Sequence, residues 1–191
     1  MKSFEGFKAE DNSNSMPTQL PAGTYVAAIL GAKVEGTEPE QVLKIRVDVI
    51  EGDFAGFYTR LYEKQTSSAD LQYQPKYKGV FTLNIPNANN SHRTMEWDIS
   101  SFNRAMYAIE QSNPNYHWDW NENGLINKVV GINVRDGGIY NGNPFTKIGR
   151  LEVADDVRKG LVKTMPPVKQ KNTAETPEAK ATPVIDIEIP F

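Results

Sequence analysis

The sequence contains no cysteine, and this absence excludes disulfide bridges and thiolate metal sites. It also has no run of about 18 apolar residues, the length that a membrane-spanning helix requires. The first sixteen residues, MKSFEGFKAEDNSNSM, lack the apolar segment of a secretory signal peptide. We therefore expect a soluble protein of a reducing cytoplasm.

Signatures of catalysis are also scarce. The two histidines, His92 and His117, lie in asparagine-rich stretches without the spacing of metal ligands, which favours solvated loop positions. The phosphate-binding loop, the dinucleotide-binding fingerprint and the nucleophile elbow are missing. Asp155 and Asp156 stand beside basic residues at the expected end of the last strand, whereas a nuclease would need acids that converge. The sequence predicts a non-enzymatic protein without a cofactor or a metal ion.

The overall charge does not by itself indicate a nucleic-acid partner. The chain carries 21 lysines and arginines against 24 aspartates and glutamates, a net charge of -3. A generic nucleic-acid binder has an excess of positive charge. A local groove can nevertheless be basic in an acidic protein, so the distribution of charge matters more than the sum.

Alternating residues in the first half of the chain predict an antiparallel sheet. A turn at residues 21–23 precedes a β-type run, and residues 43–49 alternate between apolar and polar side chains with a period of two. A turn at residues 52–53 leads to a third predicted strand. That strand would direct Phe57, Thr59 and Leu61 to the core and Tyr58, Arg60 and Tyr62 to the opposite face.

The middle of the chain predicts a long loop and then a helix. Residues 63–96 show no clear period, and the following segment has a helical one, with Asp98 or Ser100 as its cap and its end at Asn113. The buried face of the helix would carry Phe102, Met106 and Ile109. Three tryptophans are expected to pack around the helix: Trp97, Trp118 and Trp120.

The order of elements predicts a mainly β domain. Two further strands cover residues 127–135 and 144–154, joined by a turn over residues 136–143. Five strands with one helix between the third and the fourth form the oligonucleotide-binding (OB) barrel. A β-sandwich or an open α+β sheet would produce a similar order.

The two ends of the chain differ in composition from this domain, which we place at residues 20–164. Residues 1–19 are polar and predict a flexible arm. Residues 165–183 are rich in proline, lysine, glutamate, threonine and alanine, and they predict a disordered linker because they cannot bury enough apolar surface. Residues 184–191 form an acidic and hydrophobic tip that we expect to dock on other proteins.

Cations and flat rings gather where an OB barrel binds its ligand, on its second and third strands and on its first and fourth connecting loops. Binding single strands requires cations along the phosphates and rings on which bases stack. The candidate contacts are Lys44, Arg46, Tyr58, Arg60, Tyr62, Tyr73, Lys76, Tyr77, Lys78, Arg135, Tyr140, Phe145, Lys147 and Arg150. Each residue alone also suits an ordinary half-exposed strand, so the prediction depends on the set.

The end of the sequence resembles the tip of bacterial single-stranded-DNA-binding proteins. Those proteins join an OB domain through a disordered linker to an acidic tip that ends in Ile-Pro-Phe. The corresponding residues are Asp186, Ile187, Glu188, Ile189, Pro190 and Phe191. A terminal carboxylate beside phenylalanine suits a pocket with an apolar floor and a cationic rim. The resemblance implies that the tip recruits replication or recombination proteins, although its acids are fewer than usual and are interrupted by isoleucine.

Residues 18–155 are similar to a family of single-stranded-DNA-binding proteins of phages and mobile elements. The similarity lies in the opening LPAGTY and in VDVIEGDFAGFYTRLYE, where a strand ends in a glycine turn. It implies an OB fold, single-stranded DNA as the ligand, and a bacterial cell or a phage-infected host as the location. RNA in place of DNA and a homo-oligomer stay open. The rival hypothesis is an adaptor or structural phage protein that binds no nucleic acid and docks through its tail.

Overall fold

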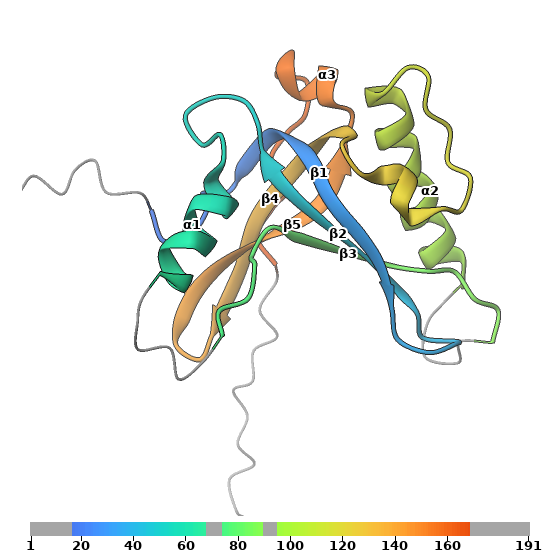
Figure 1. The fold of residues 1–191 in the computed structure, drawn as a ribbon, viewed down its shortest axis with the longest axis horizontal. Helices are drawn as coiled ribbons and strands as arrows, with labels where there is room; N and C mark the ends of the chain where they lie inside the picture. Colours follow the sequence, from blue (N-terminus) through green and yellow to red (C-terminus); the bar gives the residue numbers. More distant parts are fainter. Residues whose placement is uncertain (1–16, 68–73, 90–94, 169–191) are drawn as a thin grey trace, which may run out of the picture.

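The computed structural model describes residues 17–67, 74–89 and 95–168, and it is built on one five-stranded antiparallel sheet (Figure 1). The strands are β1 (Gly23–Glu35), β2 (Val42–Val49), β3 (Val80–Asn84), β4 (Val129–Tyr140) and β5 (Asn143–Glu152). The described helices are α1 (Phe57–Thr66), α2 (Met95–Ser112), the 3-10 helix η2 (Glu122–Leu125) and α3 (Ala154–Arg158). The predictions of a mainly β domain and of a helix between β3 and β4 are confirmed. No helix in these three ranges is long and apolar enough to span a bilayer.

Strand β1 pairs with β2 on one side and with β4 on the other. The β1–β2 hairpin and the β4–β5 hairpin point in different directions (Figure 1). The first half of β1, from Gly23 to Ala28, pairs with β4, whereas the pairing with β2 begins at Ala27 and continues to Glu35. A bulge between Ile29 and Gly31 interrupts the second ladder. Bulges bend a strand and increase its twist, which accounts for the divergence of the hairpins.

The sheet is not closed into a barrel. Its strand order is β3-β2-β1-β4-β5, so β3 and β5 are edge strands that do not pair with each other. A cavity of about 200 Å³ lies between these edges beneath α2. Its lining residues are Phe81, Leu83, Ser101, Arg104, Ala105, Gly149, Arg150, Leu151 and Met165.

The core lies between the inner face of the sheet and helix α2. The alternation predicted for β2 is confirmed, because Leu43, Ile45, Val47 and Val49 are buried. The predicted helix face is confirmed as well, with Phe102, Met106 and Ile109 buried. Removing these apolar side chains from water is the main force that holds α2 on the sheet.

The third predicted strand is wrong, because residues Phe57–Thr66 form helix α1. Phe57 and Leu61 are both buried and lie one helical turn apart, a spacing that fits a helix as well as a strand. The strand was predicted because residues 57–62 can also be assigned alternately to two faces. The helical conformation turns Tyr58 into the core beside Phe57, so the prediction that Tyr58 faces outward is also wrong.

A carboxylate from the neighbouring strand caps α1. The N-cap residue of this helix is Gly56, which has no side chain to accept hydrogen bonds from the first turn. Asp48 of β2 takes that role, because its carboxylate accepts from the backbone N–H groups of Tyr58 at 2.9 Å and Thr59 at 3.0 Å. It also accepts from the N–H of Val49 at 2.9 Å. Negative charge at a helix N-terminus is favourable, so this buried carboxylate anchors α1 to the sheet.

The true third strand, β3, lies inside the segment predicted as a loop. Phe81 and Leu83 are buried and Thr82 between them is exposed, the alternation of a half-buried strand. Helix α2 begins at Met95, before the predicted caps Asp98 and Ser100, and it ends at Ser112 as expected. Asp98 is instead a buried residue of the helix that accepts a hydrogen bond from the side chain of Asn84.

The β4–β5 hairpin is longer than predicted. The expected turn over residues 136–143 is mostly strand, and the hairpin turns at Asn141 and Gly142. Both have positive φ angles, 49° and 78°, which is the conformation that favours an Asn-Gly pair in a two-residue turn. Asp155 and Asp156 belong to α3 and not to the end of a strand.

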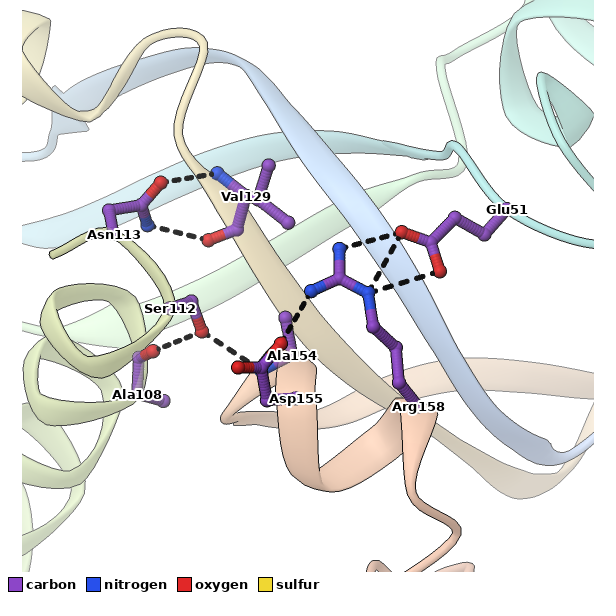
Figure 2. Close-up of polar contacts among 8 residues, drawn as sticks. All are labelled: Glu51, Ala108, Ser112, Asn113, Val129, Ala154, Asp155 and Arg158. Carbon is purple, nitrogen blue, oxygen red and sulfur yellow. Dashed lines mark hydrogen bonds and ion pairs between the residues drawn. The ribbon is translucent and has the colours of Figure 1, made fainter.

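Polar side chains join the end of α2 to β4 and α3 (Figure 2). The amide of Asn113 donates to the carbonyl of Val129 at 2.7 Å and accepts from its N–H at 3.0 Å. The hydroxyl of Ser112 accepts from the N–H of Ala154 at 2.9 Å. These bonds satisfy backbone groups in partly buried positions.

An ion pair holds α3 against the loop that follows β2 (Figure 2). The guanidinium of Arg158 contacts the carboxylate of Glu51 at 2.6 Å and that of Asp155 at 2.6 Å. Hydrogen bonds with these two acids raise the pKa of Arg158, so its charge is permanent. Because both partners are partly exposed, the contribution to stability is modest.

Candidate nucleic-acid interface

The first cluster of candidate residues lies on the outer face of β2, and we call it the Tyr77 surface: Lys44, Arg46, Tyr62, Tyr77 and Lys78. The guanidinium of Arg46 lies over the ring of Tyr77, 5.4 Å from its centroid. The Tyr77 hydroxyl donates to the carbonyl of Val47 at 3.1 Å, which fixes the ring against β2. A cation beside a fixed aromatic ring is the pair of groups that a phosphate and a base require.

The Tyr77 ring is supported from behind by α1. It lies 6.2 Å from the ring of Tyr58 and 5.8 Å from the ring of Tyr62. Tyr58 is only 5% exposed and packs over Gly79, where an added Cβ would come within 2.6 Å of the Tyr58 ring. Tyr58 therefore positions Tyr77 from inside the core, and it is not accessible to a ligand.

The cations around this cluster differ in whether a neighbouring carboxylate neutralises their charge. Lys44 faces Lys33 across the β1–β2 ladder, and Glu35 pairs with Lys44 at 2.5 Å and with Lys33 at 3.9 Å. The hydrogen bond from Lys44 lowers the pKa of Glu35. The charge of Lys44 is therefore partly neutralised, whereas Arg46 has no carboxylate partner among the described residues.

Arg60, Lys76 and Lys78, from the segments before and after Tyr73, are exposed. Arg60 donates to the carbonyl of Ala55 at 2.5 Å, so it closes the loop before α1. Lys76 and Lys78 are exposed on either side of Tyr77. Tyr73 lies outside the described residues, and so does the predicted tip.

The second cluster lies on the β4–β5 hairpin, and we call it the hairpin surface: Arg135, Tyr140, Phe145, Lys147 and Arg150. Arg135 and Lys147 are direct cross-strand partners. Like charges in such positions repel each other. In the described part of the chain no carboxylate pairs with either, and the Nε of Arg135 is buried without a hydrogen-bond partner.

Three other hairpin residues complete this surface. Tyr140 is 71% exposed beside the turn. Phe145 is half-buried against Gly137. Arg150 approaches Glu152 at 3.8 Å and lines the cavity between β3 and β5. Arg104 of α2, which is not among the predicted contacts, lines the same cavity.

A cavity connects the two clusters. It has a volume of about 270 Å³ and lies between α1, the hairpin and the segment that precedes β1. Lys78 of the Tyr77 surface and Phe145 of the hairpin surface both line it. Gln19 borders it too, donating to the carbonyl of Pro144 at 3.1 Å and accepting from the N–H of Thr146 at 2.8 Å. The structure thus places one residue of each predicted group, Lys78 and Phe145, at a common cavity, whereas Arg150 lies at the separate cavity beneath α2.

The tryptophans do not all pack as predicted. Trp118 is half-buried beside Phe102, in agreement with the prediction. Trp97 is 76% exposed, so the prediction that it packs around the helix is wrong, whereas Trp120 stacks on Phe102 of α2 and still remains 69% exposed. The helical period could not show this, because Trp120 lies in the loop after α2, whose path depends on tertiary contacts.

The raised pKa of the Tyr77 hydroxyl predicts that the protein loses stability in alkaline solution. Burial raises its pKa from 10.0 to about 12, so the folded protein keeps a proton that the unfolded chain loses. The stabilisation is complete below pH 10 and is lost as the pH rises from 10 to about 12. We expect Tyr77→Phe to reduce this slope in urea unfolding curves measured across that range. An identical slope in both proteins would contradict the assignment.

No protein-family model matches the chain, and no curated protein is significantly similar to it. The assignment of a function therefore depends on the geometry of the described residues and on the patterns in the sequence.

Proposed function

We propose that this protein binds single-stranded DNA without catalysing a reaction. The observation that carries the proposal is the pair formed by Arg135 and Lys147, two cations that face each other across β4 and β5 without a described acidic partner. Such a pair costs free energy unless an anion lies between the charges. Arg46 and Tyr77 add a second cation and a ring on the neighbouring hairpin. A ligand that carries both phosphates and bases would account for the cations and the aromatic rings of both clusters.

The arrangement of the strands supports an OB-like domain. In an OB barrel β1 lies between β2 and β4, and β3 approaches β5 with a helix between β3 and β4 in sequence. Here β1 has the same neighbours, and β3 and β5 border one cavity beneath α2. We infer a partly open OB barrel, whose ligand would run from β2 toward the β4–β5 turn.

The ends of the chain complete the proposal. Residues 165–183 would join the domain to residues 184–191, which would recruit replication or recombination proteins to the coated strand. A docking segment in the same chain as a DNA-binding domain has a raised effective concentration near the strand. The similarities described above favour a protein of a phage or a mobile element.

The decisive experiment is a fluorescence anisotropy titration of a labelled poly-thymidine oligonucleotide at low and at raised salt. We expect binding that weakens with salt and that a DNA duplex fails to displace, since stacking requires unpaired bases. An RNA oligonucleotide of equal length tests the preference between DNA and RNA. Absence of binding at low salt would refute the proposal and favour the adaptor hypothesis.

A further inference from the structure

Trp120 presents a large aromatic ring to solvent beside α2. One face of the ring is stacked on Phe102, with the centroids 5.5 Å apart and the planes inclined by 13°. Trp118 lies 6.1 Å away in a tilted orientation. The side chain nevertheless remains 69% exposed, so the stacked indole is held in place and accessible at the same time.

The backbone of Trp120 is strained in this position. Its φ angle is 65°, in the left-handed region that bulky residues seldom adopt. Such a conformation is unfavourable and is found preferentially at active sites and binding sites. The contacts with Phe102 and Trp118 cover only part of the ring, which stays 69% exposed. The strained, exposed ring therefore points to a ligand.

The surroundings of Trp120 are acidic, in contrast to the two clusters of the DNA interface. The sequence has no lysine or arginine between Arg104 and Lys128, and that interval contains Glu110, Asp119 and Glu122. Glu110 pairs with His117 at 2.8 Å, which leaves the two acids next to Trp120 without a basic partner among the described residues. A phosphate would be repelled at this surface, and a cation would be attracted.

A small hollow adjoins the ring. Its volume is about 50 Å³, and it is lined by Val34, Leu43, Ile85, Phe102, Trp118, Trp120 and Glu122. An apolar floor with two indole walls and one carboxylate suits a side chain that has an alkyl stem and a cationic end. Arginine fits this description best, because its flat guanidinium stacks on an aromatic face while it bonds to a carboxylate.

We propose that the Trp120 surface, formed by Phe102, Trp118, Trp120 and Glu122, binds an arginine side chain of a basic protein partner. Complementary charge favours a protein that itself acts on nucleic acids, since such proteins carry basic patches. Tryptophan is also among the residues that contribute most to protein interfaces. This inference goes beyond the proposed function and does not depend on it.

The test follows the three indole N–H resonances of the full-length protein by NMR. The probes are an acetylated Gly-Arg-Gly-Arg-Gly amide and its citrulline counterpart, which keeps the shape and loses the charge. We expect the arginine peptide to shift the resonances of Trp118 and Trp120 and to leave that of Trp97 in place. Equal shifts with the citrulline peptide, or shifts confined to Trp97, would overturn the proposal.

Substitutions connect the binding to individual groups. Trp120→Asn removes the ring and tolerates the left-handed backbone, and we expect it to weaken binding of the arginine peptide about twofold to fivefold, as expected for a cation–π contact at an exposed site. Glu122→Gln should weaken it several-fold, and the matched control Trp97→Ala should not. Poly-thymidine binding should be unchanged in all three variants. Weaker oligonucleotide binding by Trp120→Asn with unchanged peptide binding would identify Trp120 as a ring on which bases stack, and this result would overturn the proposal.

Discussion

Replacing Asp48 with alanine is expected to lower the free energy of unfolding by about 3 kcal/mol. The carboxylate is 5% exposed and accepts from three backbone N–H groups, those of Val49, Tyr58 and Thr59. Alanine leaves all three donors without a partner in a region from which water is excluded. Because Gly56 offers no side chain as a substitute cap, the first turn of α1 should fray. Urea unfolding followed by circular dichroism measures the loss.

The same substitution should disturb the proposed interface. Helix α1 carries Tyr58, whose ring supports Tyr77, so fraying should release the ring that lies under Arg46. We expect weaker oligonucleotide binding as well as lower stability. Asp53→Ala is the matched control, since Asp53 is an exposed aspartate of the loop between β2 and α1. Equal stability of both variants would show that Asp48 does not anchor the helix.

Replacing Arg135 and Lys147 together with glutamine is expected to weaken poly-thymidine binding roughly tenfold at low salt. Two phosphate contacts should disappear, so the slope of log affinity against log salt should fall by about 1.4, the value for two contacts on a single strand. Stability should be unchanged or slightly higher, because two facing like charges are removed from β4 and β5. This combination of weaker binding and undiminished stability distinguishes a ligand contact from a structural role.

A double control removes the same charge elsewhere. Lys128 lies over the ring of Tyr116, 4.8 Å from its centroid, and Lys159 is exposed at the end of α3. Their glutamine variant should bind the oligonucleotide with nearly the same affinity and salt slope as the unaltered protein. If both double variants lose affinity equally, the effect comes from net charge, and the hairpin surface is not the site.

Parts of the interface could be predicted from the sequence because short-range periodicity places neighbouring side chains on one face. Lys44 and Arg46 alternate with buried residues of β2, and the structure places them outward as expected. Periodicity did not predict the position of Tyr58. The alternation over residues 57–62 fits a strand, whereas the spacing of Phe57 and Leu61 fits the helix α1. Nothing within that segment decides between the two.

The sequence by itself determined four of the five strands, β1, β2, β4 and β5, and the apolar face of α2, whereas it misplaced the third strand. These features depend on the period of the chain, which is a local property. Tertiary structure alone decided that Asp48 caps α1, that Arg135 faces Lys147, and that Trp120 remains exposed. Each of these depends on how segments distant in sequence meet, and the free energy of such contacts comes from burial and hydrogen bonding that local periodicity does not contain.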